Sequence, residues 1–392
     1  MESFFRTHDY LIEHLQACVR RDLMDEIDWS QRMIGVKGTR GVGKTTFLLQ
    51  YAKEKFGRDR SCLYINMNNF YFQGRGIAEF AGEFHRIGGK VLLIDQVFKH
   101  PGWSSELRKC YDLYPDLRIV FTGSSVMRLK EENPELNGIV SSYNLRGFSF
   151  REFLNLKAGT SFQSHSLYDI VSHHEQIAQE ILKSVRPQEY FRDYLHHGFY
   201  PFFLENRNFS ENLVKTMNMM MEVDILLIKQ IELKYLARIK KLFYLMAVEG
   251  TSAPNVSQLA IETDTSRATV MNYIKYLADA RLINMVYAKG DEFPKKPARI
   301  LMHNPNLIYT IYPPRADRQD ILETFFVNTL WKDHVVHKGE KGFSYLVDGD
   351  TNFKVCTDEV RLRNNPGAYY AIDDLDLGHD NVIPLWLFGF LY

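Results

Sequence analysis

Three glycines and an adjacent lysine and threonine lie close together in the N-terminal part of the chain. The segment runs from Gly38 through Gly41 and Gly43 to Lys44 and Thr45, and it fits the pattern GxxxxGK[ST]. Glycines let backbone N–H groups curl around a phosphate, and the start of a helix adds partial positive charge. We therefore predict a phosphate loop, in which the lysine contacts the β- and γ-phosphates and the threonine hydroxyl binds Mg²⁺. The predicted nucleotide-binding residues are Gly38, Thr39, Arg40, Gly41, Val42, Gly43, Lys44, Thr45 and Thr46.

The apolar run VLLI ends at Asp95, and Gln96 follows it. A carboxylate at the carboxyl end of such a strand is placed to hold Mg²⁺ through water. The extra apolar run CLYINM between the phosphate loop and Asp95 is typical of the P-loop ATPases in which a glutamate follows the aspartate and activates water. A glutamine can orient water but cannot accept its proton, so we expect weak hydrolysis. Both a natural change and a laboratory Glu-to-Gln change explain Gln96.

The next apolar run, IVFT, continues into Gly123, Ser124 and Ser125. A polar side chain at this strand end can contact the γ-phosphate or the attacking water, and we assign this role to Ser124. The alternative is a turn in which one of the two serines caps a helix. The predicted catalytic residues are thus Lys44, Asp95, Gln96 and Ser124, and the predicted metal ligands are Thr45 and Asp95.

These residues need a parallel sheet to bring them together. Between residues 33 and 143, the runs MIGV, CLYINM, KVLLI and RIVFT have strand length, and segments with helical spacing separate them. Such alternation predicts an α/β fold with a parallel sheet covered on both faces. Further along, EQIAQEILKSV and SENLVKTMNMMMEVDILLIKQIEL predict helices, and FSYLV, NFKVC, YYAID and LWLFGFLY predict strands. We predict a P-loop core at residues 1–150, a helical lid at 151–232, a winged-helix domain at 233–290 and a C-terminal α+β domain at 291–392.

Composition excludes several classes of protein. The chain has 392 residues, of which 45% are hydrophobic and 24% charged, as in ordinary globular proteins. Lys plus Arg and Asp plus Glu both number 48, so net charge attracts neither nucleic acid nor an anionic membrane. The four cysteines are scattered, and no apolar run is long enough to span a bilayer. We therefore expect a cytoplasmic protein with reduced thiols and no membrane contact.

Three long segments together resemble the prokaryotic AAA+ family of P-loop ATPases: GTRGVGKTTFLLQY, LLIDQVFKHPGWSSELRKCYDLYPDLRIVFTGSS and LRGFSFREFL. The ending DDLDLGHDNVIPLWLFGFLY is similar to the uncharacterised C-terminal domain of that family, so the resemblance covers nearly the whole chain. It implies ATP or ADP and Mg²⁺ as ligands. It also implies a core followed by a lid, a winged helix and a C-terminal domain.

The chain departs from the family pattern at several positions. In the family a glutamate follows the aspartate and a histidine comes two residues later, where this chain has Gln96 and Phe98. Arginines usual before the LRGFSFREFL-like segment are absent, since LNGI occupies residues 136–139, and Arg128 or Arg146 are the available substitutes. Several changes in one site favour a natural loss of hydrolysis over a single engineered change.

In the predicted winged helix, DNA would be contacted by Arg267, Asn272 and Lys275 on the last helix, with Ser266, Thr269 and Tyr273 also exposed. Asp264 or Thr265 would cap this helix, and residues 289–296 would form the wing. Acidic residues in the same segment balance its charge, which weakens the case for DNA. The alternative is a module that packs between domains.

The C-terminal domain resembles restriction-endonuclease folds, which need an aspartate and then an acid-x-lysine on the next strand. Asp348 stands at the first position, but Lys354 and Cys356 stand where the acid and the lysine should be. We therefore predict an inactive scaffold or a partner-binding surface. The acidic residues at 373, 374 and 376 are interpreted as a solvated strand end, and the pair His196–His197 as a surface pair rather than a metal site.

Two functions remain open at this stage. In the first, ATP with Mg²⁺ acts as a switch that orders the lid and repositions the winged helix and the C-terminal domain, with slow hydrolysis. In the second, the chain is a DNA-binding or protein-interaction module, and the nucleotide is only a structural cofactor. The sequence identifies no protein partner and no oligomeric state.

Overall fold

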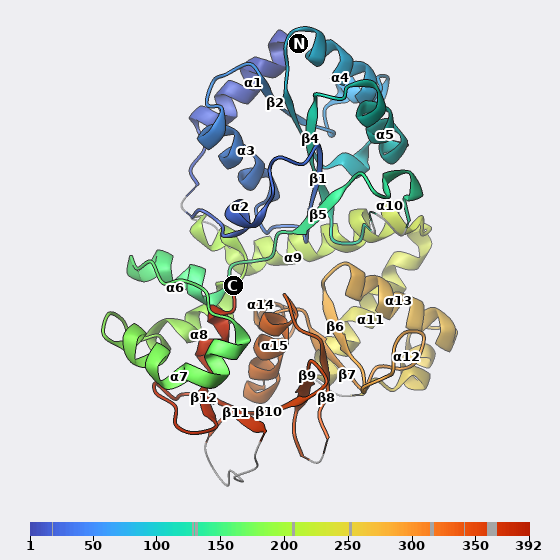
Figure 1. Ribbon diagram of the computed structural model, residues 1–392. Coiled ribbons are helices and arrows are strands. Elements are labelled where there is room, and N and C mark those ends of the chain that lie inside the picture. The colour runs from blue at the N-terminus through green and yellow to red at the C-terminus, as the bar shows by residue number, and fades with distance from the viewer. Residues whose placement is uncertain are drawn as a thin grey trace. The chain divides into compact units, whose positions relative to one another are not determined.

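The computed structural model describes the chain except for residues 18, 128, 130, 131, 206, 207, 251, 252, 314–316, 341 and 359–366. The chain divides into two compact units, Met1–Gly147 and Phe148–Tyr392. Figure 1 shows their helices and strands. Among the described residues, no helix combines the length and the apolar composition needed to cross a membrane.

The described part of the first unit forms a five-stranded parallel sheet in the order β2-β3-β4-β1-β5. Its strands are β1 (Met33–Gly38), β2 (Cys62–Asn66), β3 (Val91–Asp95), β4 (Arg118–Ser124) and β5 (Ser141–Asn144). The first four coincide to within one residue at either end with the runs MIGV, CLYINM, KVLLI and RIVFT or extend beyond them, which confirms the α/β class. Because β4 lies between β1 and β3, the carboxyl ends of these three strands meet at one edge of the sheet.

Helices cover both faces of this sheet. Figure 1 shows α1 and α3 on one face and α4 and α5 on the other. The helices are α1 (Glu2–Glu13), α2 (Leu23–Glu26), α3 (Lys44–Lys55), α4 (Ile77–Arg86) and α5 (Trp103–Leu113), with short 3₁₀ turns at η1 (Phe70–Gln73), η2 (Val97–Lys99) and η3 (Pro134–Leu136). In α4, Ile77, Phe80, Ala81 and Phe84 are buried at helical spacing, so one stripe of the helix faces the sheet.

Strand β2 lies at the edge of the sheet, where helix α1 packs against it. His8 of α1 is buried, and its Nδ1 accepts a hydrogen bond from the backbone N–H of Tyr64 at 2.9 Å. Because Nδ1 is the acceptor, the neutral ring carries its proton on Nε2. Burial lowers the pKa of His8 below its ordinary value of 6.5, so the folded chain favours the neutral ring.

We expect the first unit to lose stability as the pH falls below about 6.5, where an unfolded histidine takes up a proton. The folded chain accepts that proton only at a lower pH, so the free energy of unfolding falls by at most about 1.4 kcal/mol per pH unit from this group. Hydrogen exchange of the Tyr64 amide, corrected for intrinsic rates, measures the effect.

The variant His8→Gln keeps an acceptor that does not titrate, and its Tyr64 amide should show little pH dependence. His14→Gln, at an exposed histidine just beyond the same helix, should behave like the unchanged chain. Equal pH dependence in all three proteins would contradict the role given to His8.

The described part of the second unit contains a five-stranded sheet in the order β12-β11-β10-β9-β8 and a two-stranded sheet, β6-β7. The strands are β6 (Ile283–Val286), β7 (Arg299–Met302), β8 (Val336–Lys338), β9 (Tyr345–Val347), β10 (Thr351–Cys356), β11 (Ala368–Ile372) and β12 (Val382–Pro384). The helices are α6 (Phe150–Ala158), α7 (Leu167–Leu182), α8 (Gln188–His197), α9 (Phe209–Met219), α10 (Leu226–Lys229), α11 (Leu236–Glu249), α12 (Val256–Glu262), α13 (Arg267–Asp279), α14 (Pro305–Ile311) and α15 (Arg318–Leu330). A π-helical segment, η5 (Met220–Ile225), joins α9 to α10, and further 3₁₀ turns are η4 (Pro201–Leu204) and η6 (Leu233–Tyr235).

One hydrophobic core of this unit draws on residues 150–195 and on residues 286–392. The rings of Phe191 in α8 and Phe325 in α15 lie 4.9 Å apart between centroids, and those of Phe150 and Phe390 lie 6.2 Å apart. Residues that the sequence assigns to a helical lid and to a C-terminal domain thus pack into one hydrophobic core. The division into a lid, a winged helix and a C-terminal domain, with boundaries at 232 and 290, stays a prediction.

The last predicted strand, LWLFGFLY, is wrong. Leu385–Phe390 forms the 3₁₀ helix η8, and all six of its residues are buried. An apolar run that is buried on all sides has no polar face, so its periodicity does not distinguish a strand from a helix. The other three predicted C-terminal strands are present as β9, β10 and β11, whereas the sequence did not reveal β7, β8 and β12.

Candidate functional site

The phosphate loop connects β1 to α3. Gly41 and Gly43 have φ angles of 87° and 93°, a left-handed backbone that favours glycine. At position 38, glycine is needed for a steric reason, because a Cβ atom there would lie 2.4 Å from the carbonyl oxygen of Leu145. Two of the glycines therefore shape the loop, and the third allows the segment after β5 to approach β1.

Lys44 is the first residue of α3, and its side chain folds back over the loop. Its Nζ donates to the carbonyl oxygens of Gly38 and Thr39 at 2.7 and 2.8 Å. Thr45 and Thr46 follow at the exposed start of the helix. The loop thus presents a cation, two hydroxyl groups and the N-terminus of a twelve-residue helix at the same place.

Asp95 ends β3 and is completely buried. Among the described residues, four side chains donate hydrogen bonds to its carboxylate. Oδ2 accepts from the Thr45 hydroxyl at 2.7 Å, and Oδ1 accepts from the Thr122 hydroxyl. Oδ2 also accepts from the Tyr64 hydroxyl at 2.9 Å and from the Asn66 amide at 3.1 Å. The structure therefore brings together the two residues that the sequence assigned to a metal.

Sequence reasoning missed the two donors on β2. In the sheet β2 is paired with β3, and Asn66 lies directly opposite Asp95 in the register. The polar residue at the end of the run CLYIN could have indicated a contact with Asp95. That prediction would have required knowing that this strand lies beside the strand that ends at Asp95.

Residues 30–154 match a protein-family model described as an AAA domain. These residues form an AAA domain. The match and the loop geometry make it a P-loop domain of the nucleotide-binding ATPase type, as the resemblance implied for the core. A second model, described as a domain of unknown function (DUF8612), matches residues 188–302.

An uncharacterized protein of Methanocaldococcus jannaschii is 25% identical over 299 residues, which are 72% of this chain, and the chain spans 61% of that relative. Solved structures are similar at lower sequence identity. The Aeropyrum pernix Orc1 protein in complex with DNA is 12% identical over 83% of this chain and 92% of its own, with a TM-score of 0.32. DnaA from Aquifex aeolicus bound to AMPPCP is 14% identical over 70% of this chain and 86% of its own, with a TM-score of 0.26.

In the AAA domain, Gln96 follows Asp95 with a left-handed backbone, φ 56° and ψ 48°. Its backbone N–H donates to the Thr122 hydroxyl at 2.8 Å, and its side chain is partly exposed. Ser124 is buried, and its hydroxyl accepts from the backbone N–H of Val126 at 3.4 Å. Thr122 thus contacts Asp95, and the sensor role given to Ser124 stays a prediction.

Arg21, which the sequence did not single out, attaches the phosphate loop of the AAA domain to the segment after β5. Its guanidinium donates to the carbonyl oxygens of Val42 at 3.4 Å, Arg146 at 2.9 Å and Gly147 at 3.0 Å. Arg146, one of the two proposed substitute arginines, is therefore held here by its backbone. The other, Arg128, lies outside the described residues.

Helix α13 supports only part of the predicted DNA surface. Arg267 and Asn272 are exposed, but Tyr273 is 5% exposed, so its predicted exposure is wrong. Lys275 donates to Asp279 at 2.8 Å, and both side chains are largely buried. The helix is capped by Ser266, whose hydroxyl accepts from the N–H of Thr269, rather than by Asp264 or Thr265.

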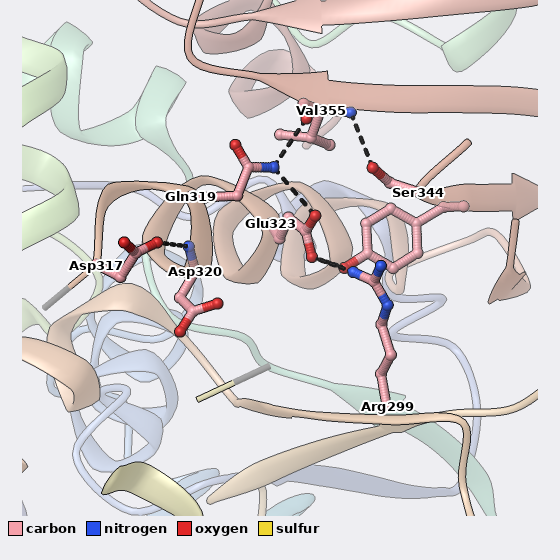
Figure 2. Close-up of polar contacts among 8 residues, drawn as sticks. Arg299, Asp317, Gln319, Asp320, Glu323, Ser344 and Val355 are labelled. Atoms are coloured by element: carbon pink, nitrogen blue, oxygen red, sulfur yellow. Dashed lines mark hydrogen bonds and ion pairs between the residues drawn. The ribbon is translucent and has the colours of Figure 1, made fainter. Parts of the chain in front are cut away.

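The second unit contains a buried polar cluster centred on Glu323 of α15 (Figure 2). Its carboxylate pairs with Arg299 and accepts from the Tyr345 hydroxyl at 2.9 Å and from the Gln319 amide at 3.0 Å. The Gln319 amide also donates to the carbonyl oxygen of Val355 at 2.8 Å. Burial and the charge of Glu323 raise the pKa of Tyr345 well above its ordinary value, so the phenol stays a donor.

Two carboxylates that the sequence singled out in the C-terminal region, Asp348 and Asp373, have hydrogen-bond or ion-pair partners. Asp348 accepts from His334 Nδ1 at 2.7 Å and from the Val335 N–H at 2.9 Å. Asp373 is buried and paired with Arg318, so its interpretation as part of a solvated strand end is wrong. Within the described residues, no group of three or more His, Cys, Asp or Glu side chains could hold a metal ion.

Proposed function

We propose that this chain binds ATP with magnesium at the phosphate loop and acts as a nucleotide-dependent switch with slow hydrolysis. The observation that carries the proposal is the contact of 2.7 Å between the Thr45 hydroxyl and Asp95, next to Lys44 at the start of α3. Hydroxyl and carboxylate oxygens are the ligands that Mg²⁺ prefers, and it takes few protein ligands when phosphates supply the others.

Each residue then has one task. Lys44 would exchange its loop carbonyl acceptors for the β- and γ-phosphates, while the N–H groups at residues 41–46 bind phosphate oxygens. Thr45 and Asp95 would hold Mg²⁺, which neutralises charge on the phosphates when it is bound. Gln96, whose backbone is fixed by Thr122, can orient water but cannot take its proton, which supports slow hydrolysis.

The chemistry of Gln96 is tested by an ATPase assay of the chain, with Gln96→Glu beside it and Lys44→Ala as the blank. We expect turnover near the blank for the chain and at least about 100-fold more for Gln96→Glu, because a positioned base contributes roughly 10²- to 10⁴-fold. Turnover well above the blank in the unchanged chain would show that Gln96 suffices. If nucleotide binds but Gln96→Glu remains inactive, more than the base is missing.

The second candidate is a DNA-binding or protein-interaction module with nucleotide as a structural cofactor. Its support is reduced by the burial of Tyr273 and the pairing of Lys275, which leave Arg267 and Asn272 as exposed contacts. A switch must respond differently to ATP and ADP, whereas a structural cofactor need not. Hydrogen exchange of the whole chain with each nucleotide separates the two.

A further inference from the structure

The buried hydroxyl of Tyr64 has no role in the function proposed above. Tyr64 is in the middle of β2, is 4% exposed, and reaches across to the neighbouring strand. Its hydroxyl donates to Oδ2 of Asp95 at 2.9 Å and lies 3.3 Å from the amide nitrogen of Asn66. The phenol thus connects the edge strand of the sheet to the carboxylate beside the phosphate loop.

Oδ2 of Asp95 has more donors than it can satisfy well. Thr45, Tyr64 and Asn66 all donate to it, whereas a carboxylate oxygen offers about two lone-pair sites. Of the three donors, Thr45 is the one whose hydroxyl oxygen would also bind the metal. Tyr64 and Asn66 have no other task at the site and hold the carboxylate.

The two remaining donors are fixed in place. Oδ1 of Asn66 accepts from the backbone N–H of Asn68 at 2.8 Å, so its NH₂ group points to Asp95 and Tyr64. A phenol carries its proton at neutral pH, so the Tyr64 hydroxyl is a donor to the Asp95 carboxylate.

We propose that Tyr64 is a positioning residue of the magnesium–nucleotide site, because its hydroxyl fixes the Asp95 carboxylate beside Thr45. This inference rests on the proposed function. Partners that orient a metal ligand typically change metal affinity by about 10- to 100-fold. The hydroxyl therefore sets how much Mg²⁺ the site requires and leaves binding of the metal-free nucleotide unchanged.

The test is a titration of a fluorescent ATP derivative, first with EDTA and then with increasing Mg²⁺, on the chain and on Tyr64→Phe. We expect affinities in EDTA that agree within about twofold, and a Mg²⁺ requirement about tenfold higher in the variant. Tyr51→Phe is the matched control, since Tyr51 is 3% exposed in the same unit but stacks on Trp29. It should require as much Mg²⁺ as the unchanged chain.

A double-mutant cycle keeps the test decisive if the variant is less stable. In an Asp95→Asn background, Tyr64→Phe should change the Mg²⁺ requirement no further, because its effect passes through that carboxylate. An unchanged Mg²⁺ requirement in Tyr64→Phe, or an equal loss with and without Mg²⁺, would overturn the inference. Failure of the unchanged chain to bind the nucleotide, or to respond to Mg²⁺, would instead refute the proposed function itself.

Discussion

Replacing Lys44 by alanine is expected to weaken ATP binding about 100-fold. The ammonium group is the cation that the loop offers, and in this structure two loop carbonyl oxygens already hold it in place. Hydrogen bonds to charged groups contribute roughly 1.5–3 kcal/mol, and each 1.4 kcal/mol changes affinity tenfold, so the loss of contacts to two phosphates gives about this factor. Equilibrium titration with a fluorescent ATP derivative measures it.

The matched control is Lys55→Ala, at the exposed end of the same helix. It removes the same charge and should leave affinity within about twofold, because exposed charges at that distance are screened by salt. If Lys44→Ala bound ATP as tightly as the control, nucleotide would have to bind elsewhere on the chain. A thermal melt of each variant separates lost binding from lost folding.

Replacing Arg299 by methionine is expected to lower the free energy of unfolding of the second unit by about 3 kcal/mol. Methionine keeps most of the apolar volume but removes the charge that pairs with Glu323, whose side chain is 6% exposed. Among the described residues, the carboxylate then keeps the hydroxyl of Tyr345 and the amide of Gln319 as donors, and Figure 2 shows the second of these. Urea unfolding, with hydrogen exchange of α15 as the local probe, measures the loss.

Arg238→Met is the control for this prediction, because Arg238 pairs with an Asp264 side chain that is 94% exposed. An exposed pair of this kind should contribute less than about 1 kcal/mol. The double variant Arg299→Met with Glu323→Leu should recover most of the stability, since replacing both members of a buried pair is often nearly neutral. A loss for Arg299→Met no larger than for Arg238→Met would show that Glu323 does not depend on its arginine.

Local patterns predicted the first unit well. The phosphate loop is a continuous stretch of sequence, so Gly41, Gly43 and Lys44 could be assigned without knowledge of the fold. Asp95 was identified because buried parallel strands are continuous apolar runs, and a charged residue at the end of one stands out. Both signals are local in the chain.

Features that depend on strand order were not predictable. Tyr64 contacts Asp95 because β2 pairs with β3, and nothing within CLYIN states this. The burial of Tyr273 follows from local spacing, since Tyr273 lies three residues after Val270 and four before Leu277, on the buried face of α13. For LWLFGFLY no pattern was available, because its surroundings are apolar on every side.

The shared core of the second unit limits where recombination could divide such a chain without disrupting the packing of its side chains. The match to the domain of unknown function covers residues 188–302, yet Phe191 within it packs on Phe325 beyond it and on Phe150 before it. A recombination event at either end of that match would separate side chains that have to fit one another. A junction at residues 147 and 148 keeps both cores whole. The segment that the family model matches is therefore shorter than the segment whose side chains share one core.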